Sequence, residues 1–116
     1  MTGSTDVNVR RPPVVVVNGT APPTTVTVSP SATVTVAVSN GPANPTDWVA
    51  LAQVGSSDYS YISWQYLNGF QTPPGSGLSS ATLTFTMPAT TGNYEFRFFA
   101  NNGYTKLATS TTVTVQ

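Results

Sequence analysis

The sequence contains no cysteine and no histidine. Without cysteine there is no disulfide framework, no thiol nucleophile and no thiolate metal site. Without histidine there is no ordinary Ser–His or Cys–His pair to activate a nucleophile, and no imidazole to bind zinc. These two absences remove most enzyme classes and lead us to expect no cofactor.

Charge is almost as scarce, because only eight of the 116 residues are charged, four of each sign. A nucleic-acid-binding protein needs a basic face, and an electrostatic membrane anchor needs a basic cluster. No apolar run approaches the ~20 residues of a membrane span. We therefore expect neither nucleic acid as a partner nor membrane insertion.

The acidic residues do not indicate a catalytic pair, although two carboxylates could in principle support glycoside hydrolysis. Asp47 is expected to open a strand from a turn, and Asp58 to lie in a hairpin. Glu95 is expected on a solvent-facing strand surface, paired with Arg97 or Lys106. A calcium site would need several oxygen ligands that converge at one loop. Asp47 or Asp58, together with backbone carbonyls, could supply them. The prediction is no catalytic residue and no metal ligand.

The length indicates one domain, preceded by a distinct N-terminal segment. Residues 1–23 read as an extended arm or edge strand, because Arg10-Arg11-Pro12-Pro13 and Pro22-Pro23 disfavour helix. Between these pairs, the run Val14, Val15, Val16 and Val17 is apolar on both faces. It is either the first edge strand of this domain or a strand that docks on a neighbouring subunit.

From residue 24 to residue 116 the pattern is all strand. Short stretches alternate apolar and polar residues, and Gly, Pro, Asn and Ser separate them. The expected strands are 25–28, 33–38, 47–54, 59–66, 81–87, 92–99 and 104–115. No amphipathic helix interrupts them, so we predict an all-β, immunoglobulin-like antiparallel β-sandwich of seven to eight strands without a disulfide.

The clearest of these strands follows Gly92. Tyr94, Phe96 and Phe98 alternate with Glu95 and Arg97, which predicts a strand with one buried face. A Gly two residues before Tyr94 is typical of a tyrosine corner, in which the hydroxyl binds back to the chain. We also expect Trp48 and Phe85 in the core, although the pattern leaves open whether Trp48/Ala50 or Val49/Leu51 points inward.

Several stretches of this sequence share a recognisable pattern: Asp47-Trp48-Val49-Ala50-Leu51, Val54-Gly55, Tyr59-Ser60-Tyr61 through Trp64, and Gly92 through Phe98, continued from Asn101 to Ser110. Together they resemble the SKICH domain. The same string is similar to Ig-like accessory domains of bacterial secreted enzymes and surface proteins, over residues 24–116. The resemblance implies a β-sandwich module without catalytic residues, used for targeting, attachment or spacing.

The aromatic residues of 59–66 suggest where a ligand binds. Ile62, Trp64 and Tyr66 should share one strand face, and Tyr59 and Tyr61 the other. Both faces cannot be core, so one aromatic set should be exposed, either as a sugar-stacking platform or as packing against a neighbour or across strands. The residues proposed for carbohydrate are Trp64, Tyr66 and Phe70 for stacking, with Gln65 and Asn68 for hydrogen bonds.

The sequence is compatible with two functions. The first is a non-catalytic surface attachment or display module that binds polysaccharide weakly. The second is a structural virion decoration protein or assembly subunit whose arm docks on a neighbour. The Thr-rich, weakly charged composition favours an extracellular, cell-surface or virion-surface location, with a larger assembly or a parent polypeptide as partner.

Overall fold

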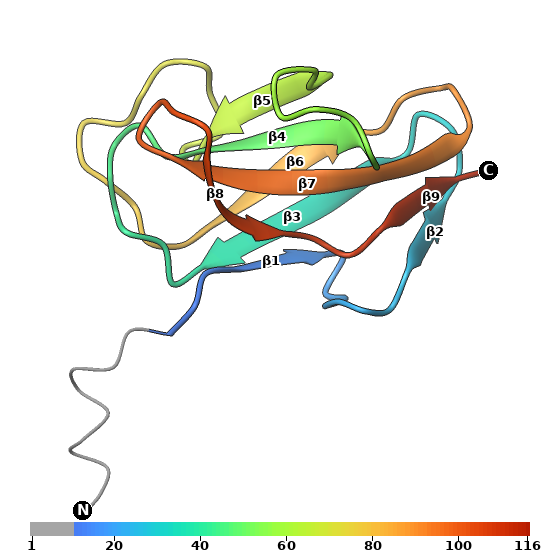
Figure 1. The fold of residues 1–116 in the computed structure, drawn as a ribbon, viewed down its shortest axis with the longest axis horizontal. Helices are drawn as coiled ribbons and strands as arrows, with labels where there is room; N and C mark the ends of the chain where they lie inside the picture. Colours follow the sequence, from blue (N-terminus) through green and yellow to red (C-terminus); the bar gives the residue numbers. More distant parts are fainter. Residues whose placement is uncertain (1–10) are drawn as a thin grey trace, which may run out of the picture.

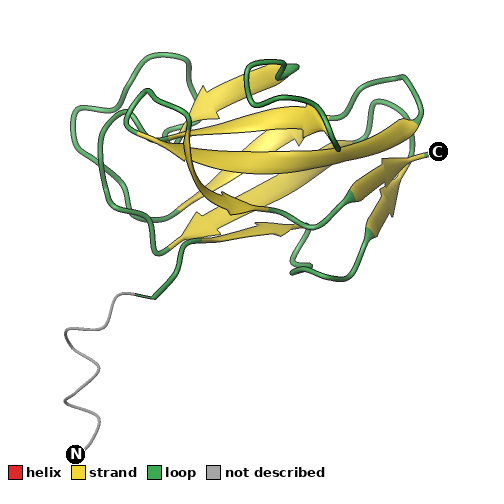
Figure 2. Cartoon of the chain, viewed as in Figure 1, coloured by secondary structure: helices red, strands yellow, loops and turns green. Residues whose placement is uncertain are grey.

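The protein is an all-β sandwich of two sheets, seen in a computed structural model that describes residues 11–116 (Figure 1). Residues 1–10 of the expected arm lie outside the described part. No helix of residues 11–116 is long and apolar enough to cross a membrane. Figure 2 shows strands joined by loops throughout this range. The strands are β1 (Val14–Val17), β2 (Val26–Val28), β3 (Thr33–Ser39), β4 (Trp48–Gln53), β5 (Ser63–Tyr66), β6 (Ala81–Thr86), β7 (Gly92–Ala100), β8 (Thr105–Thr109) and β9 (Val113–Val115).

One sheet has the order β1-β3-β6, and the other has the order β2-β9-β7-β4-β5 with β8 also paired to β7. All pairs are antiparallel except β2 with β9, which is parallel. The stretch expected as one long last strand is divided into β8 and β9, which pair with different ends of β7. The described part therefore has nine strands, more than predicted, although the fold class is confirmed.

The main core lies between the two sheets. In β3 and β6 the valine, leucine and phenylalanine side chains point inward, while the intervening threonines are exposed. This alternation buries apolar area on one face only, which is the main favourable term in folding. In β4 the inward side chains are Val49 and Leu51, which decides the orientation that the pattern left open.

The tyrosine corner is present. The Tyr94 hydroxyl donates a hydrogen bond of 2.8 Å to the Thr90 carbonyl oxygen. Gly92 has a φ of 154°, a backbone conformation that side-chain-bearing residues rarely adopt, so this position favours glycine. Tyr94, Phe96 and Phe98 are buried on the inner face, as predicted.

The valine run forms β1 within the chain's own smaller sheet. Val15 and Val17 are buried in the core, and the strand pairs antiparallel with β3. The run is thus the first edge strand of this sandwich, which begins ten residues before the expected boundary at residue 24. The alternative prediction, in which all four valines dock on a neighbouring subunit, does not hold for Val15 and Val17, whose side chains already belong to this core, while Val14 and Val16 are half-buried.

Trp48 requires a second correction. It is buried, with 5% of its surface exposed, but it does not lie between the sheets. Because Val49 points inward, Trp48 and Ala50 point to the outer face of the larger sheet. There they form a separate apolar cluster with Tyr66 and Phe99. This outer cluster positions the candidate site.

Candidate functional site

An open pocket of about 150 Å³ lies on the outer face of the larger sheet. Its lining contains no charged side chain; five of the six lining residues are aromatic and the sixth is an amide. The lining residues are Trp48, Tyr61, Trp64, Tyr66, Asn102 and Tyr104. They come from β4, β5, the loop before β5, and the turn between β7 and β8. We call this feature the aromatic pocket.

Trp48 is the residue around which the other rings gather. Its ring centroid lies 4.7 Å from that of Phe99, its partner in the pairing of β4 with β7. It also makes edge contacts with Tyr61 at 5.2 Å and with Trp64 at 6.0 Å. Aromatic pairs at such distances and steep angles are favourable beyond their buried area. The Trp48 Nε1–H donates to the Gly103 carbonyl at 3.0 Å, which fixes the indole.

The strand β5 supplies one side of the pocket. Tyr66 lies opposite Trp48 and Trp64 lies opposite Ala50 in the antiparallel register. Residues directly opposite in a sheet share a face, so both rings project outward beside Trp48. The Trp64 and Tyr66 rings are 4.9 Å apart and nearly perpendicular.

A fully buried carboxylate holds the opposite side in place. Asp47 is 0% exposed and accepts hydrogen bonds from the Asn44 backbone N–H at 3.0 Å and from the Asn101 backbone N–H at 2.9 Å. The Asn44 amide group donates a third bond at 3.2 Å. Thr46 adds a hydroxyl bond to the Asn101 side chain. These contacts fasten the β7–β8 turn to the start of β4.

The fastened turn presents Asn102 to the pocket. Asn101 and Asn102 have φ of 57° and 58°, a left-handed conformation that asparagine tolerates in tight hairpins. The Asn102 N–H donates to the Thr46 carbonyl at 2.7 Å. The Tyr66 hydroxyl donates to Asn102 Oδ1 at 2.6 Å. That bond orients the amide and leaves its two N–H groups as donors at the pocket lining.

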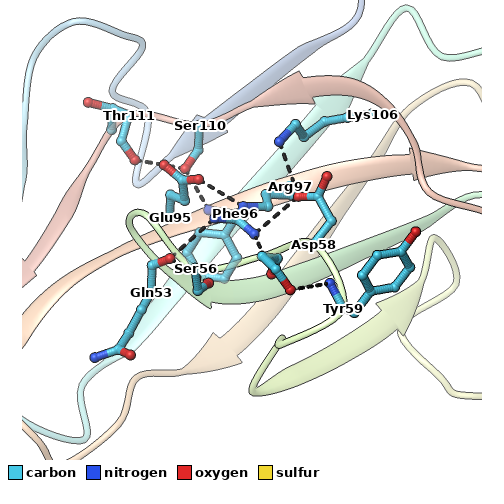
Figure 3. Close-up of polar contacts among 11 residues, drawn as sticks. Gln53, Ser56, Asp58, Tyr59, Glu95, Phe96, Arg97, Lys106, Ser110 and Thr111 are labelled. Atoms are coloured by element: carbon cyan, nitrogen blue, oxygen red, sulfur yellow. Dashed lines mark hydrogen bonds and ion pairs between the residues drawn. The ribbon is translucent and has the colours of Figure 1, made fainter.

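Arg97 positions the loop 54–62 over the outer face (Figure 3). Its guanidinium, whose side chain is only 4% exposed, donates to Glu95 at 2.8 Å and to Asp58 at 3.1 Å. It also donates to the backbone carbonyls of Ser57 at 3.1 Å and Gln53 at 3.2 Å. A planar group with five donors suits such a set of acceptors. The loop that carries Tyr59 and Tyr61 is therefore held by one buried cation.

The ion pairs of this cluster match the sequence expectation in part. Glu95 pairs with Arg97, as expected, whereas Lys106 pairs with Asp58 at 3.1 Å. Asp58, Glu95, Arg97 and Lys106 are four of the eight charged residues in the sequence. The chain thus concentrates half of its charge beside the aromatic pocket, where it supports a loop.

Three tyrosines of the loop and turn lie close together at the rim. The Tyr59 and Tyr104 ring centroids are 4.4 Å apart. The Tyr61 side chain, through hydrogen bonding, raises the pKa of Tyr104 above its ordinary value, and burial together with Tyr61 and Tyr59 adds to the rise. Tyr104 therefore remains a neutral phenol, able to donate and accept, at all physiological pH values.

Comparisons with protein-family models, curated proteins and solved structures found no match. Within residues 11–116, no group of three or more acidic side chains is arranged to hold a metal ion.

Two of the five residues predicted for carbohydrate, Trp64 and Tyr66, line the aromatic pocket. The other three lie elsewhere. Gln65 faces the opposite side of β5 and donates to the Thr84 carbonyl of the other sheet at 2.7 Å. Asn68 is a turn residue that accepts from the Phe70 N–H and donates to the Thr72 carbonyl. Phe70 is 68% exposed but is not part of the pocket lining.

Four lining residues were not among those predicted for a ligand: Trp48, Tyr61, Asn102 and Tyr104. Alternation along an expected strand 59–66 predicts Tyr61 on the opposite face from Trp64, but β5 begins only at Ser63, so Tyr61 lies in the preceding loop and the alternation does not apply to it. The Gly55-Ser56-Ser57-Asp58 stretch is the signal that a loop extends further. Asn102 and Tyr104 join the site only through pairing of β7 with β8, which a local pattern does not reveal.

Proposed function

We propose that this chain is a non-catalytic attachment module that holds a neutral sugar ring in the aromatic pocket. The supporting observation is the composition of the lining: five aromatic rings, one oriented amide and no charged group. Pockets of this kind, mostly apolar with a few fixed polar groups, are the usual form of small-ligand sites.

The chemistry of the lining suits a sugar. The C–H bonds on one face of a pyranose pack against aromatic rings, whose π faces carry partial negative charge. Its hydroxyl groups need donors and acceptors, which the Asn102 amide and the Tyr61 and Tyr104 phenols supply. A charged ligand would find no opposite charge in the lining. A neutral, hydroxyl-bearing ring is therefore the favoured occupant.

Single-site binding of this kind should be weak. One small pocket buries little area, and association costs several kcal/mol of translational and rotational freedom. Many copies displayed on a cell surface, a virion or a larger polypeptide would raise the apparent affinity by avidity. This combination describes an attachment module better than an enzyme, since no carboxylate lines the pocket to act as acid or base.

Affinity electrophoresis through gels that contain different polysaccharides tests the proposal. The parent protein should be retarded by at least one neutral glycan, and Trp64→Ala should remove that retardation. Phe70→Ala is the matched control, because it also deletes an exposed aromatic ring but lies outside the pocket lining. Migration of Trp64→Ala identical to the parent on every retarding gel, with Phe70→Ala impaired, would exclude the aromatic pocket.

The alternative, an assembly or virion decoration subunit, would be favoured if no glycan retarded the parent. The valine run supports it less than the sequence alone did, because β1 pairs with the chain's own β3 and buries Val15 and Val17 in the core. Analytical ultracentrifugation of the full chain would then measure whether copies associate.

A further inference from the structure

Tyr59 lies just outside the aromatic pocket and is unusually exposed. It is 72% exposed, the most of any large apolar or aromatic side chain described. Its ring packs against Tyr104 at 4.4 Å and 61°, and Tyr104 in turn contacts Trp48 at 5.7 Å. The aromatic surface therefore continues from the pocket, over Tyr104, to Tyr59. Figure 3 shows the Tyr59 ring turned away from the Arg97 cluster.

The backbone that carries Tyr59 is nevertheless held firmly. The Tyr59 N–H donates to Ser57 Oγ at 3.2 Å. Its neighbour Asp58 pairs with both Arg97 and Lys106 at 3.1 Å. Ser57 is further fixed by the bond from Arg97 to its carbonyl oxygen. An exposed ring on a fixed backbone contributes little to folding, yet it is pre-organised for a ligand.

We propose that Tyr59 forms a second subsite, so that the ligand is a linear oligosaccharide of at least two sugar units. One sugar ring occupies the aromatic pocket, and the next sugar ring along the chain stacks on Tyr59 beside Tyr104. This inference rests on the proposed function, because it extends the same ligand beyond the pocket. The phenol groups of Tyr59 and Tyr104 offer hydroxyl partners to the second ring.

The subsite makes a prediction about chain length. A stacked aromatic contact corresponds to roughly a 2- to 10-fold gain in affinity. The parent protein should therefore bind the disaccharide by that factor more tightly than the monosaccharide. Longer chains should gain little more, because among residues 11–116 Tyr104 is the one ring that packs against Tyr59, and no further ring extends the surface from it.

The experiment is a calorimetric or NMR titration of the full chain with mono-, di- and trisaccharides from the glycan that retards it in the gel. Tyr59→Ala should lower disaccharide affinity to the monosaccharide value and leave monosaccharide affinity unchanged. Phe70→Ala should reproduce the parent at every length. Tyr59→Phe separates stacking from hydroxyl bonding, and near-ultraviolet circular dichroism confirms that each variant keeps the aromatic cluster.

The outcomes separate this inference from the proposed function. Equal affinity of the parent for one and two sugar units, with no effect of Tyr59→Ala, would overturn the second subsite and leave the pocket proposal standing. Loss of monosaccharide binding in Tyr59→Ala would also overturn it, because Tyr59 would then act on the pocket itself. Absence of binding to any glycan would reject the proposed function first.

Discussion

At the scale of single residues, Asp47 shows how a buried charge can serve a surface site. Acidic side chains are almost never fully buried unless they are paired. Asp47 has no cation beside it among its described bonds and is instead satisfied by three N–H donors from Asn44 and Asn101. A carboxylate is suited to this role because both oxygens accept several hydrogen bonds. Its contribution is the position of the turn that carries Asn102.

Replacing Asp47 tests that role. Asp47→Asn removes the charge and brings an amide N–H against backbone N–H groups. Hydrogen bonds to charged groups contribute about 1.5–3 kcal/mol, so the free energy of unfolding should fall by about 2–3 kcal/mol. Urea denaturation followed by tryptophan fluorescence measures it. Thr46→Val, which removes an exposed hydroxyl bond to the same turn, should cost under about 1 kcal/mol; equal losses would show that the charge is unimportant.

The tyrosine corner allows a second test at this scale. Tyr94→Phe removes only the hydroxyl that donates to the Thr90 carbonyl. The expected loss is about 0.5–1.5 kcal/mol in the free energy of unfolding, with an unchanged urea m value. Glycan binding should not change, because Tyr94 faces the inner core. Tyr59→Phe, at an exposed hydroxyl, is the stability control and should unfold like the parent.

At the scale of elements, the loop 54–62 is ordered by side-chain contacts to β7. Arg97 lies on the outer face of β7, opposite Ala50 of β4. Its buried guanidinium binds two carboxylates and two carbonyls, so the loop covers what would otherwise be an open sheet face. A buried ion pair gives little net stability over an apolar pair, but removing one partner leaves the other uncompensated.

Truncating Arg97 should therefore have a local and a global effect. Arg97→Ala should lower the free energy of unfolding by about 3–5 kcal/mol and free the loop 54–62. Limited proteolysis or hydrogen exchange should report faster cleavage or exchange in this loop than in β3, which lies in the other sheet. Arg97→Lys should restore only part of the protection, since one ammonium cannot reach all four acceptors. Unchanged protection in Arg97→Ala would show that the loop is ordered by other contacts.

Elements with strict alternation could be predicted from the sequence, and elements set by tertiary pairing could not. The Thr–Val pattern gave β3 with its inward face, and the Gly-x-Tyr spacing gave the tyrosine corner. The division of the last strand into β8 and β9 was not predicted. It occurs at Ser110, whose hydroxyl accepts from the Phe96 N–H and whose N–H donates to the Phe96 carbonyl, and a local pattern does not reveal such bonds to another strand. The pairing partner of the valine run could not be predicted for a similar reason. A strand with apolar residues on both faces can pair with this domain's own sheet or with that of a neighbouring subunit.

The candidate site was predictable only where it lies on a regular strand. Trp64 and Tyr66 alternate correctly, so their shared face was found. Gln65 lies between these two residues, so the same alternation places its side chain on the opposite, inner face of β5. The prediction that Gln65 assists the ligand was therefore inconsistent with the predicted strand. Asn102 and Tyr104 lie more than fifty residues after Trp48 in the sequence, and only the register of β7 with β8 and β4 brings them to it.

At the scale of the whole molecule, the edge of the larger sheet beside the pocket is closed. The Tyr66 N–H donates to the Phe70 carbonyl, and Gln71 donates to the Trp64 carbonyl. These bonds occupy outward backbone groups of β5, which would otherwise be available to another strand. Gln65 links this edge to the smaller sheet through Thr84. A partner at this end of the sandwich would thus meet side chains, which is consistent with recognition by the aromatic pocket.

The neutrality of the whole site gives a last prediction, on pH and salt. The pKa of Tyr104 is raised in the folded protein, so the neutral phenol is favoured there. The stabilisation of the folded state by the neutral Tyr104 phenol is fully present below the ordinary tyrosine pKa of about 10. It is lost as the pH rises through the higher pKa of the folded state, where the phenol also loses the proton that it can donate to a ligand. Glycan affinity should consequently stay constant from about pH 5 to 9 and fall only at more alkaline pH.

Absorbance at about 295 nm, where phenolate absorbs, follows the ionisation of the tyrosines, and Tyr104→Phe should remove the alkaline fall in glycan affinity. Affinity should also be the same at about 0.05 and 0.5 M NaCl, since screening acts on charges and the lining contains none. A fall in affinity between pH 5 and 9, or a marked loss in salt, would mean that a charged group contacts the ligand. The nearest candidates would then be Asp58 and Lys106, whose ion pair lies beside Tyr59, and Lys106→Met would identify which charge is involved.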